Sequence, residues 1–151
     1  MAEAFREEYA ADPSVRVFSK HYDGNRQEFG LNELLYDVLV CRVDGVASSA
    51  HGKRLLCVRD ALRQVESEFA RDSGQALMDF NKLVLGSAEN KLSVGPHVYD
   101  EGAFLGVLAQ AACRCSGAVY AALVPHPDRW DAGERQVAVW RLDGGRWASL
   151  T

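Results

Sequence analysis

The chain has 151 residues, of which 48% are hydrophobic and 25% are charged, as in an ordinary globular protein of about one domain. This composition excludes disordered, collagen-like and small disulfide-knot proteins. The net charge is −4, which argues against a protein that binds nucleic acid through a uniformly basic surface. It does not exclude an enzyme that binds phosphate groups through a metal cation.

Targeting signals are not evident in the sequence. No apolar run approaches the length of a membrane span, and the N-terminus lacks the basic and apolar segments of a signal peptide. We therefore expect a cytoplasmic protein that makes no membrane contact and keeps its four cysteines reduced.

The sequence contains no repeat and no linker, so a single domain over residues 1–151 is expected. The elements predicted for the first part of the chain are a helix over residues 3–11, a strand over 15–18, a helix over 27–36 and a strand over 38–43. The last of these strands is rich in β-branched valines and ends at Asp44-Gly45, a dipeptide typical of turns.

The second part of the chain alternates between helical and extended patterns. The predicted elements are a helix over residues 75–85, a strand over 91–95, a helix over 101–114 capped by Asp100, a strand over 118–124, and a hairpin of 135–142 with 146–150. This alternation predicts an α/β fold, with a mixed central β-sheet flanked by helices and a C-terminal β-hairpin.

The segment over residues 54–72 has two interpretations. Its apolar residues are spaced 3, 4, 3 and 4 apart, which favours an amphipathic helix: Leu55, Val58, Leu62, Val65 and Phe69. On such a helix Glu66 and Glu68 point about 200° apart and are ordinary solvated acids. On a strand from about residue 61 to 69 the two carboxylates share one face, where they can bind one hard cation such as Mg2+.

Four short motifs follow one another: Asn32-Glu-Leu-Leu-Tyr-Asp37, Val65-Glu-Ser-Glu-Phe69, Asp79-Phe-Asn-Lys-Leu83 and Lys91-Leu-Ser-Val94. This succession resembles uncharacterised members of the PD-(D/E)XK superfamily over about residues 27–125. The resemblance implies a restriction-endonuclease-like fold and a Mg2+-dependent nuclease that hydrolyses phosphodiester bonds of nucleic acid. In that superfamily a helix carries a glutamate, the next strand an aspartate, and a neighbouring strand a (D/E)-x-K motif.

Carried over to this chain, the resemblance makes Glu33 the helix glutamate, which either supports the metal ligands from behind or binds the metal through a water molecule. Asp37, Glu66 and Glu68 become the Mg2+ ligands, with Glu68 also a candidate general base. The sequence departs from the pattern because no proline precedes Asp37 and because Glu68 replaces the lysine. Lys82, on the next predicted helix, is the candidate for the missing positive charge. We expect the carboxylates of Asp37, Glu66 and Glu68 to converge around one cation.

A second hypothesis comes from the acidity of the chain and its lack of an evident basic groove. A small non-catalytic binding protein, such as an inhibitor or an immunity-like partner, has these properties. The partners to consider are therefore nucleic acid, another protein or a second copy of the chain. We expect Cys113 and Cys115 to be core residues rather than zinc ligands, and His126 to be a loop residue.

Overall fold

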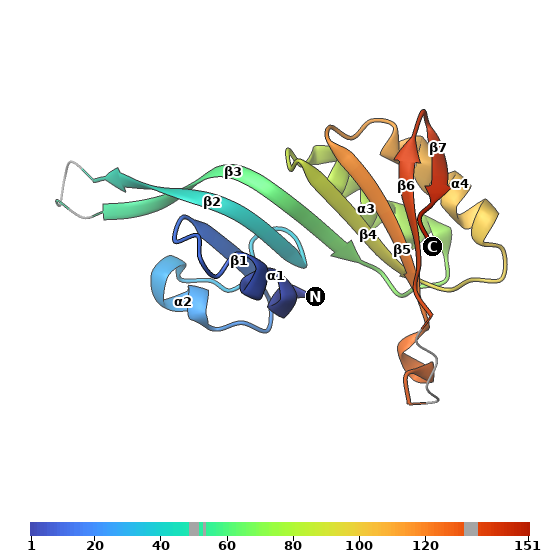
Figure 1. The fold of residues 1–151 in the computed structure, drawn as a ribbon, viewed down its shortest axis with the longest axis horizontal. Helices are drawn as coiled ribbons and strands as arrows, with labels where there is room; N and C mark the ends of the chain where they lie inside the picture. The colour runs from blue at the N-terminus through green and yellow to red at the C-terminus, as the bar shows by residue number, and fades with distance from the viewer. Residues whose placement is uncertain (49–51, 53, 132–135) are drawn as a thin grey trace. The chain divides into compact units, whose positions relative to one another are not determined.

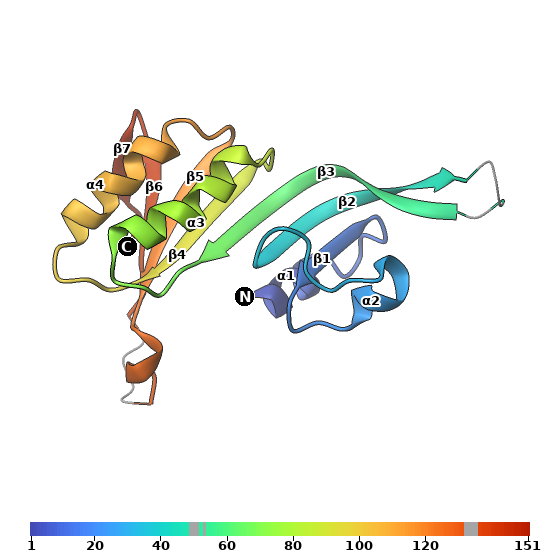
Figure 2. The same cartoon turned by 180° about the vertical axis from the view of Figure 1, so that it is seen from behind.

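The computed structural model describes residues 1–48, 52, 54–131 and 136–151. These residues form two compact units, Met1–Gln64 and Val65–Thr151, which are described separately below (Figures 1 and 2). The fold is α/β with both parallel and antiparallel strand pairs, as the sequence predicts. The single-domain organisation stays a prediction.

The first unit is a small antiparallel structure with short helices. Its elements are α1 (Ala2–Glu8), β1 (Val15–Ser19), α2 (Gly24–Phe29), β2 (Val38–Ala47) and the greater part of β3 (Arg54–Ser67). β1 pairs with β2, and β2 lies beside β3. Consecutive residues of these two strands are buried, and Phe18 of β1 and Val40 and Cys41 of β2 are completely so. The predicted first helix and first two strands are confirmed.

The helix predicted over residues 27–36 is wrong. α2 ends at Phe29 because Gly30 adopts a left-handed conformation with φ of 76°, which stops a helix. Beyond it the chain is irregular up to Asp37, and Leu35 also has a positive φ, of 66°. Glu33 is therefore not a helix residue, contrary to the role that the resemblance gives it.

The ambiguous segment is a strand. β3 extends from Arg54 to Ser67, so the helical spacing of its apolar residues is misleading. The spacing does not follow burial, because Leu55 is 55% exposed whereas Leu62 and Val65 are buried. Pairing in a sheet has overridden the local pattern. Glu66 lies in the strand, and Glu68 follows its last residue.

The second unit contains the remaining elements. These are α3 (Ser73–Leu85), β4 (Asn90–Pro96), α4 (Glu101–Ala112), β5 (Ala118–Val124), the 3-10 turn η1 (Pro127–Arg129), β6 (Ala138–Asp143) and β7 (Arg146–Ser149). β4 and β5 are parallel, whereas β5 with β6 and β6 with β7 are antiparallel. The last three residues of β3 also belong to this unit, and β3 neighbours β4. The helices and strands predicted here are confirmed, although the predicted start of the hairpin at Arg135 lies outside the described residues.

The core of the second unit lies between the sheet and its two helices. Figure 2 shows α3 and α4 side by side on one face of the β4–β7 sheet. Phe80 and Leu83 of α3, Leu108 of α4 and Leu123 of β5 are almost completely buried. The indole Nε1 of Trp147 donates to the carbonyl of Leu105 at 2.7 Å, which ties the terminal hairpin to α4.

The four cysteines, all of which lie in described ranges, are free thiols. Cys113 is exposed and Cys115 is half-buried, so the expectation that both are core residues is wrong. The reason is that α4 ends at Ala112, which makes Cys113 the exposed C-terminal cap of that helix. Over residues 1–48, 52, 54–131 and 136–151, no helix has the length and apolar character needed to cross a membrane.

Candidate functional site

Glu66 is the most deeply buried acidic residue of the predicted site. Its side chain is 2% exposed, and its Oε2 accepts a hydrogen bond from Nζ of Lys82 at 2.8 Å. Lys82 lies in the last turn of α3, so the pair links the end of β3 to that helix. A buried carboxylate is tolerable because this ammonium group compensates its charge.

Lys82 also contacts Asp79, one turn earlier on α3, at 2.9 Å. The hydrogen bonds that Lys82 donates to Glu66 and, to a smaller degree, to Asp79 raise its pKa, so its ammonium group stays charged. The same contact with Lys82, and to a smaller degree a side-chain hydrogen bond with Glu68, holds the pKa of Asp79 below its usual value. Glu66, Lys82, Asp79 and Glu68 therefore form one connected polar group, called here the Lys82 cluster.

Glu68 is fixed by its backbone as well as by its side chain. Its N–H donates to the carbonyl of Val94 in β4 at 2.9 Å, and its Oε1 accepts from the N–H of Ala70 at 2.6 Å. Glu66 reaches Lys82 of α3 from within the strand, whereas Glu68 lies just beyond the end of β3, so the shared carboxylate face stays a prediction. Asp79 was not predicted as a site residue, although its position three residues before Lys82 on a helix was a usable signal.

Glu33 and Asp37 belong to the first unit. Glu33 is exposed in the irregular segment after α2, and Asp37 is half-buried immediately before β2. Asp37 and the two glutamates lie in different units, so the convergence of Asp37, Glu66 and Glu68 stays a prediction.

Magnesium fits the donor chemistry of the Lys82 cluster. Mg2+ takes one or two protein carboxylates together with water and phosphate oxygens, and Glu66 and Glu68 offer such oxygens. Among the described residues, no group of three or more His, Cys, Asp or Glu side chains is arranged to hold a metal ion. Mg2+ therefore stays a proposal.

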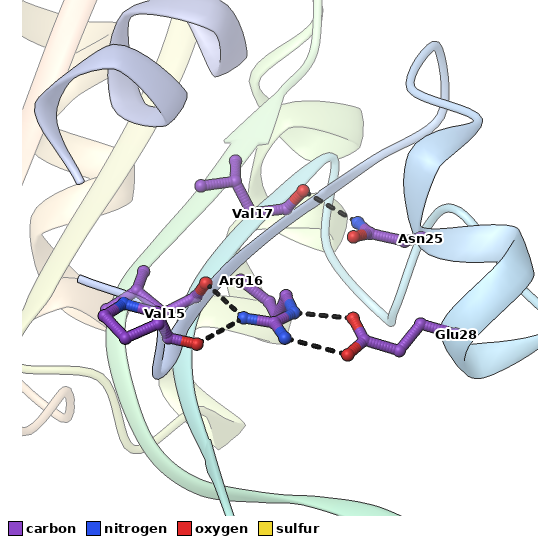
Figure 3. A network of polar contacts seen from close by, with 6 residues as sticks. Val15, Arg16, Val17, Asn25 and Glu28 are labelled. Atoms are coloured by element: carbon purple, nitrogen blue, oxygen red, sulfur yellow. Dashed lines mark hydrogen bonds and ion pairs between the residues drawn. The ribbon is translucent and has the colours of Figure 1, made fainter. Parts of the chain in front are cut away.

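A second polar network lies in the first unit (Figure 3). The guanidinium of Arg16 makes a two-point contact with Glu28, at 2.6 and 2.8 Å, and donates to the carbonyls of Pro13 and Val15. The bond from Arg16 holds the pKa of Glu28 below its usual value. Pro13, Arg16 and Glu28 line an open groove of about 940 Å3. Because the contacts use Nε and both terminal nitrogens of Arg16, this network stabilises the groove wall.

No protein-family model matches the sequence, and no curated protein and no solved structure matches the chain. The resemblance to the PD-(D/E)XK superfamily therefore depends on the motifs and on the contacts described above.

Proposed function

We propose that the chain is a cytoplasmic, restriction-endonuclease-like protein that hydrolyses phosphodiester bonds of nucleic acid with the help of Mg2+. The observation that supports this proposal is the bond between Lys82 and Glu66 at 2.8 Å. The (D/E)-x-K motif needs a lysine beside its acidic pair, and here Glu68 occupies the lysine position. Lys82 brings a positive charge to the same carboxylates from the next helix.

Each residue of the proposed site has a distinct role. Asp37, Glu66 and Glu68 would hold Mg2+, which when bound supplies positive charge to the phosphate and acidifies a water molecule. Glu68 would accept the proton of the attacking water. Lys82, kept charged by Glu66 and Asp79, would neutralise the negative charge that develops on the phosphate oxygens. Glu33 would orient these groups from the irregular segment before β2.

A cleavage assay tests this proposal. The wild type should cleave single- or double-stranded DNA or RNA with Mg2+ or Mn2+, and EDTA should abolish cleavage. Asp37→Asn, Glu66→Gln and Lys82→Met should each lower the rate by about a hundredfold or more, the usual effect of losing one charge-stabilising group. Asp143→Asn, which changes an exposed residue outside the Lys82 cluster, is the matched control and should retain full activity.

Thermal melting gives a second readout that does not depend on activity. A ligand that binds only the native state stabilises it, so millimolar Mg2+ should raise the melting temperature of the wild type and do so much less for Asp37→Asn. Asp37→Asn should leave stability without metal unchanged or slightly higher, because it relieves repulsion between carboxylates. If Mg2+ and Mn2+ leave the wild-type curve unmoved and Asp37→Asn is markedly destabilised, Asp37 is a structural acid. The non-catalytic binding protein then replaces the nuclease.

A further inference from the structure

A small cavity of the second unit lies where two parallel strands end. Pro96 and Val124 are partners at the carboxyl ends of β4 and β5, which run in the same direction (Figure 1). A cavity of about 360 Å3, called here the basic pocket, is lined by residues that follow these strand ends and by Arg71, which lies between β3 and α3. The residues after the strand ends are His97, Tyr99, His126 and Arg129. Ligands of open α/β sheets commonly bind outside the carboxyl ends of parallel strands.

Arg71 is the cation of the basic pocket that is available to a ligand. Its guanidinium makes no hydrogen bond and no ion pair with any residue that the structure describes. An arginine fork with unused donors matches the oxygens of a phosphate group, to which it can bind through two parallel hydrogen bonds. Arg129, on η1, adds a second positive charge to the lining of the same cavity.

The two histidines of the pocket are oriented by carboxylates. In His126, Nδ1 lies 3.0 Å from Oδ2 of Asp128 and accepts the backbone N–H of Asp128 at 3.3 Å, a bond that places the ring proton on Nε2. Nε2 makes no hydrogen bond within the described part of the chain, so in this tautomer it can donate to a ligand. In His97 both ring nitrogens face acceptors, Glu101 Oε1 at 2.7 Å and the carbonyl of Gln136 at 3.1 Å. Only a ring protonated on both nitrogens satisfies the two acceptors together. His97 therefore lines the pocket, and neither of its ring nitrogens is assigned to the ligand.

An apolar hollow adjoins the basic pocket. It measures about 410 Å3, shares Arg71 and Tyr99 with the pocket, and extends to Phe104 and Val107 of α4. The side chain of Tyr99 is fully exposed although it lies between the two cavities. The acidic side chain that lines this hollow, Asp100, is engaged at the start of α4, where its carboxylate accepts the N–H of Ala103. An exposed aromatic ring beside an apolar surface is a place where a planar base can stack.

The loop that carries His126 and Arg129 is held in position by Trp130. The indole Nε1 donates to the carbonyl of Pro125 at 2.7 Å, and the ring meets Phe69 edge-on at 6.3 Å. Phe69 follows Glu68 directly, so this contact connects the loop to the segment after β3. The pocket is therefore preformed, which lowers the entropy lost when a ligand binds.

We propose that the second unit binds a nucleotide, with its phosphate in the basic pocket and its base on Tyr99 over the apolar hollow. Arg71 and His126 Nε2 donate hydrogen bonds to the phosphate oxygens, and Arg129 adds positive charge. The ligand is a free nucleoside monophosphate or the phosphorylated end of a nucleic-acid strand, since both present the same groups. Binding requires neither Mg2+ nor the Lys82 cluster, so this proposal is independent of the nuclease activity.

Calorimetric titration of the full chain in EDTA tests the phosphate contact, with adenosine monophosphate, adenosine and inorganic phosphate as probes. The monophosphate should bind at least about tenfold more tightly than adenosine. Arg71→Gln should weaken it by about tenfold or more, because one charge-assisted hydrogen bond is lost. Arg146→Gln, at an exposed arginine on β7, is the matched control and should bind like the wild type. Equal binding by Arg71→Gln and the wild type, or no binding at millimolar monophosphate, would overturn the proposal.

Tyr99→Ala tests the base contact. It should weaken the monophosphate by about fivefold or more, as expected for loss of one stacked base, and leave inorganic phosphate unchanged. Leu85→Ala, at an equally exposed apolar side chain of the same unit, should change neither affinity. Equal loss for both probes would refute the stacking role. Decathymidylate with and without a 5′-phosphate shows whether the ligand is a strand end or a free nucleotide. If the phosphorylated strand binds more tightly than the monophosphate, the ligand is a phosphorylated strand end. If the monophosphate binds more tightly, the ligand is a free nucleotide.

Discussion

Arg16 and Arg71 each line a cavity, and their surroundings are opposite. Arg16 is fully engaged by Glu28 and by two backbone carbonyls (Figure 3), whereas Arg71 has no polar partner in the described part of its unit. The groove beside Arg16 is also the larger of the two, about 940 Å3 against 360 Å3. Cavity size is therefore a poor guide to binding. For these two arginines the difference lies in their donors: those of Arg71 are unused and could serve a ligand, whereas those of Arg16 are satisfied within the protein and stabilise it.

Lys91 is the extreme case of a satisfied cation and gives the largest expected effect. Its side chain is fully buried, and Nζ donates to the carbonyls of Ala88 and Ser116 and to the Ser116 hydroxyl. Lys91→Ala should lower the free energy of unfolding by about 3 kcal/mol, because it leaves a cavity and unpaired acceptors. Urea denaturation measures this change. Lys20→Ala, at an exposed site, is the control and should stay within about 0.5 kcal/mol of the wild type.

Arg16→Ala and Arg71→Ala compare the two arginines directly. Loss of the Arg16 contacts should cost about 1–2 kcal/mol of unfolding free energy, since the pair with Glu28 is partly exposed. Arg71→Ala should change stability by less than about 0.5 kcal/mol, because no hydrogen bond or ion pair with a described residue is lost. A large destabilisation by Arg71→Ala in urea denaturation would contradict the distinction between the two residues.

The pH dependence of stability sharpens the assignment of Arg16. Arg16 lowers the pKa of Glu28 below 4.5 in the folded chain, so the unfolded chain binds the proton more tightly. The stabilisation is therefore present above about pH 4.5 and is lost as the pH falls through the folded pKa. The stability difference between the wild type and Arg16→Ala should shrink when urea denaturation is repeated from pH 6 down to pH 3. A difference that is constant over this range would exclude the ion pair as its source.

The smallest expected effect is a change in the local opening of the first unit, which the rate of cysteine alkylation measures. Cys41 is buried on β2, and burial raises the pKa of its thiol to about 11, whereas Cys57 on β3 is exposed. At pH 8 iodoacetamide should modify Cys57 readily and Cys41 very slowly, because the thiolate is the reactive form. Arg16→Ala should accelerate labelling of Cys41 while Arg71→Ala leaves it unchanged. Peptide mass spectrometry measures both rates.

Elements with strong local signals could be predicted from the sequence, whereas those decided by tertiary pairing could not. Asp72 and Asp100 cap α3 and α4 with their side chains, and both helices were predicted. The prediction of a helix over residues 27–36 was wrong because Gly30, in a left-handed conformation, ends α2 at Phe29. β3 carries a helical spacing of apolar residues that only pairing in the sheet overrides, so its sequence left two interpretations open.

The candidate sites follow the same division. The contact between Lys82 and Glu66 could be anticipated, because the helix that carries Lys82 is the next element after the strand that carries Glu66. The basic pocket was not predicted, because its residues are widely spaced along the chain. His97 is brought close to His126 and Arg129 by the parallel pairing of β4 and β5, and Arg71 comes from the segment between β3 and α3. Nothing in the net charge of −4 indicates such a concentration of basic groups.

The parallel pairing of β4 and β5 also has a consequence for the order of folding. β6 and β7 are joined by the two glycines of a tight turn, with φ of 53° and 81°, and hairpins of this kind form within about 1–10 μs. β4 and β5 can pair only after the intervening α4 has brought distant residues together, and such non-local contacts form more slowly. The basic pocket needs both strand ends, so it is completed late in folding. A nucleotide that binds there would recognise only chains whose β4–β5 pair has already formed.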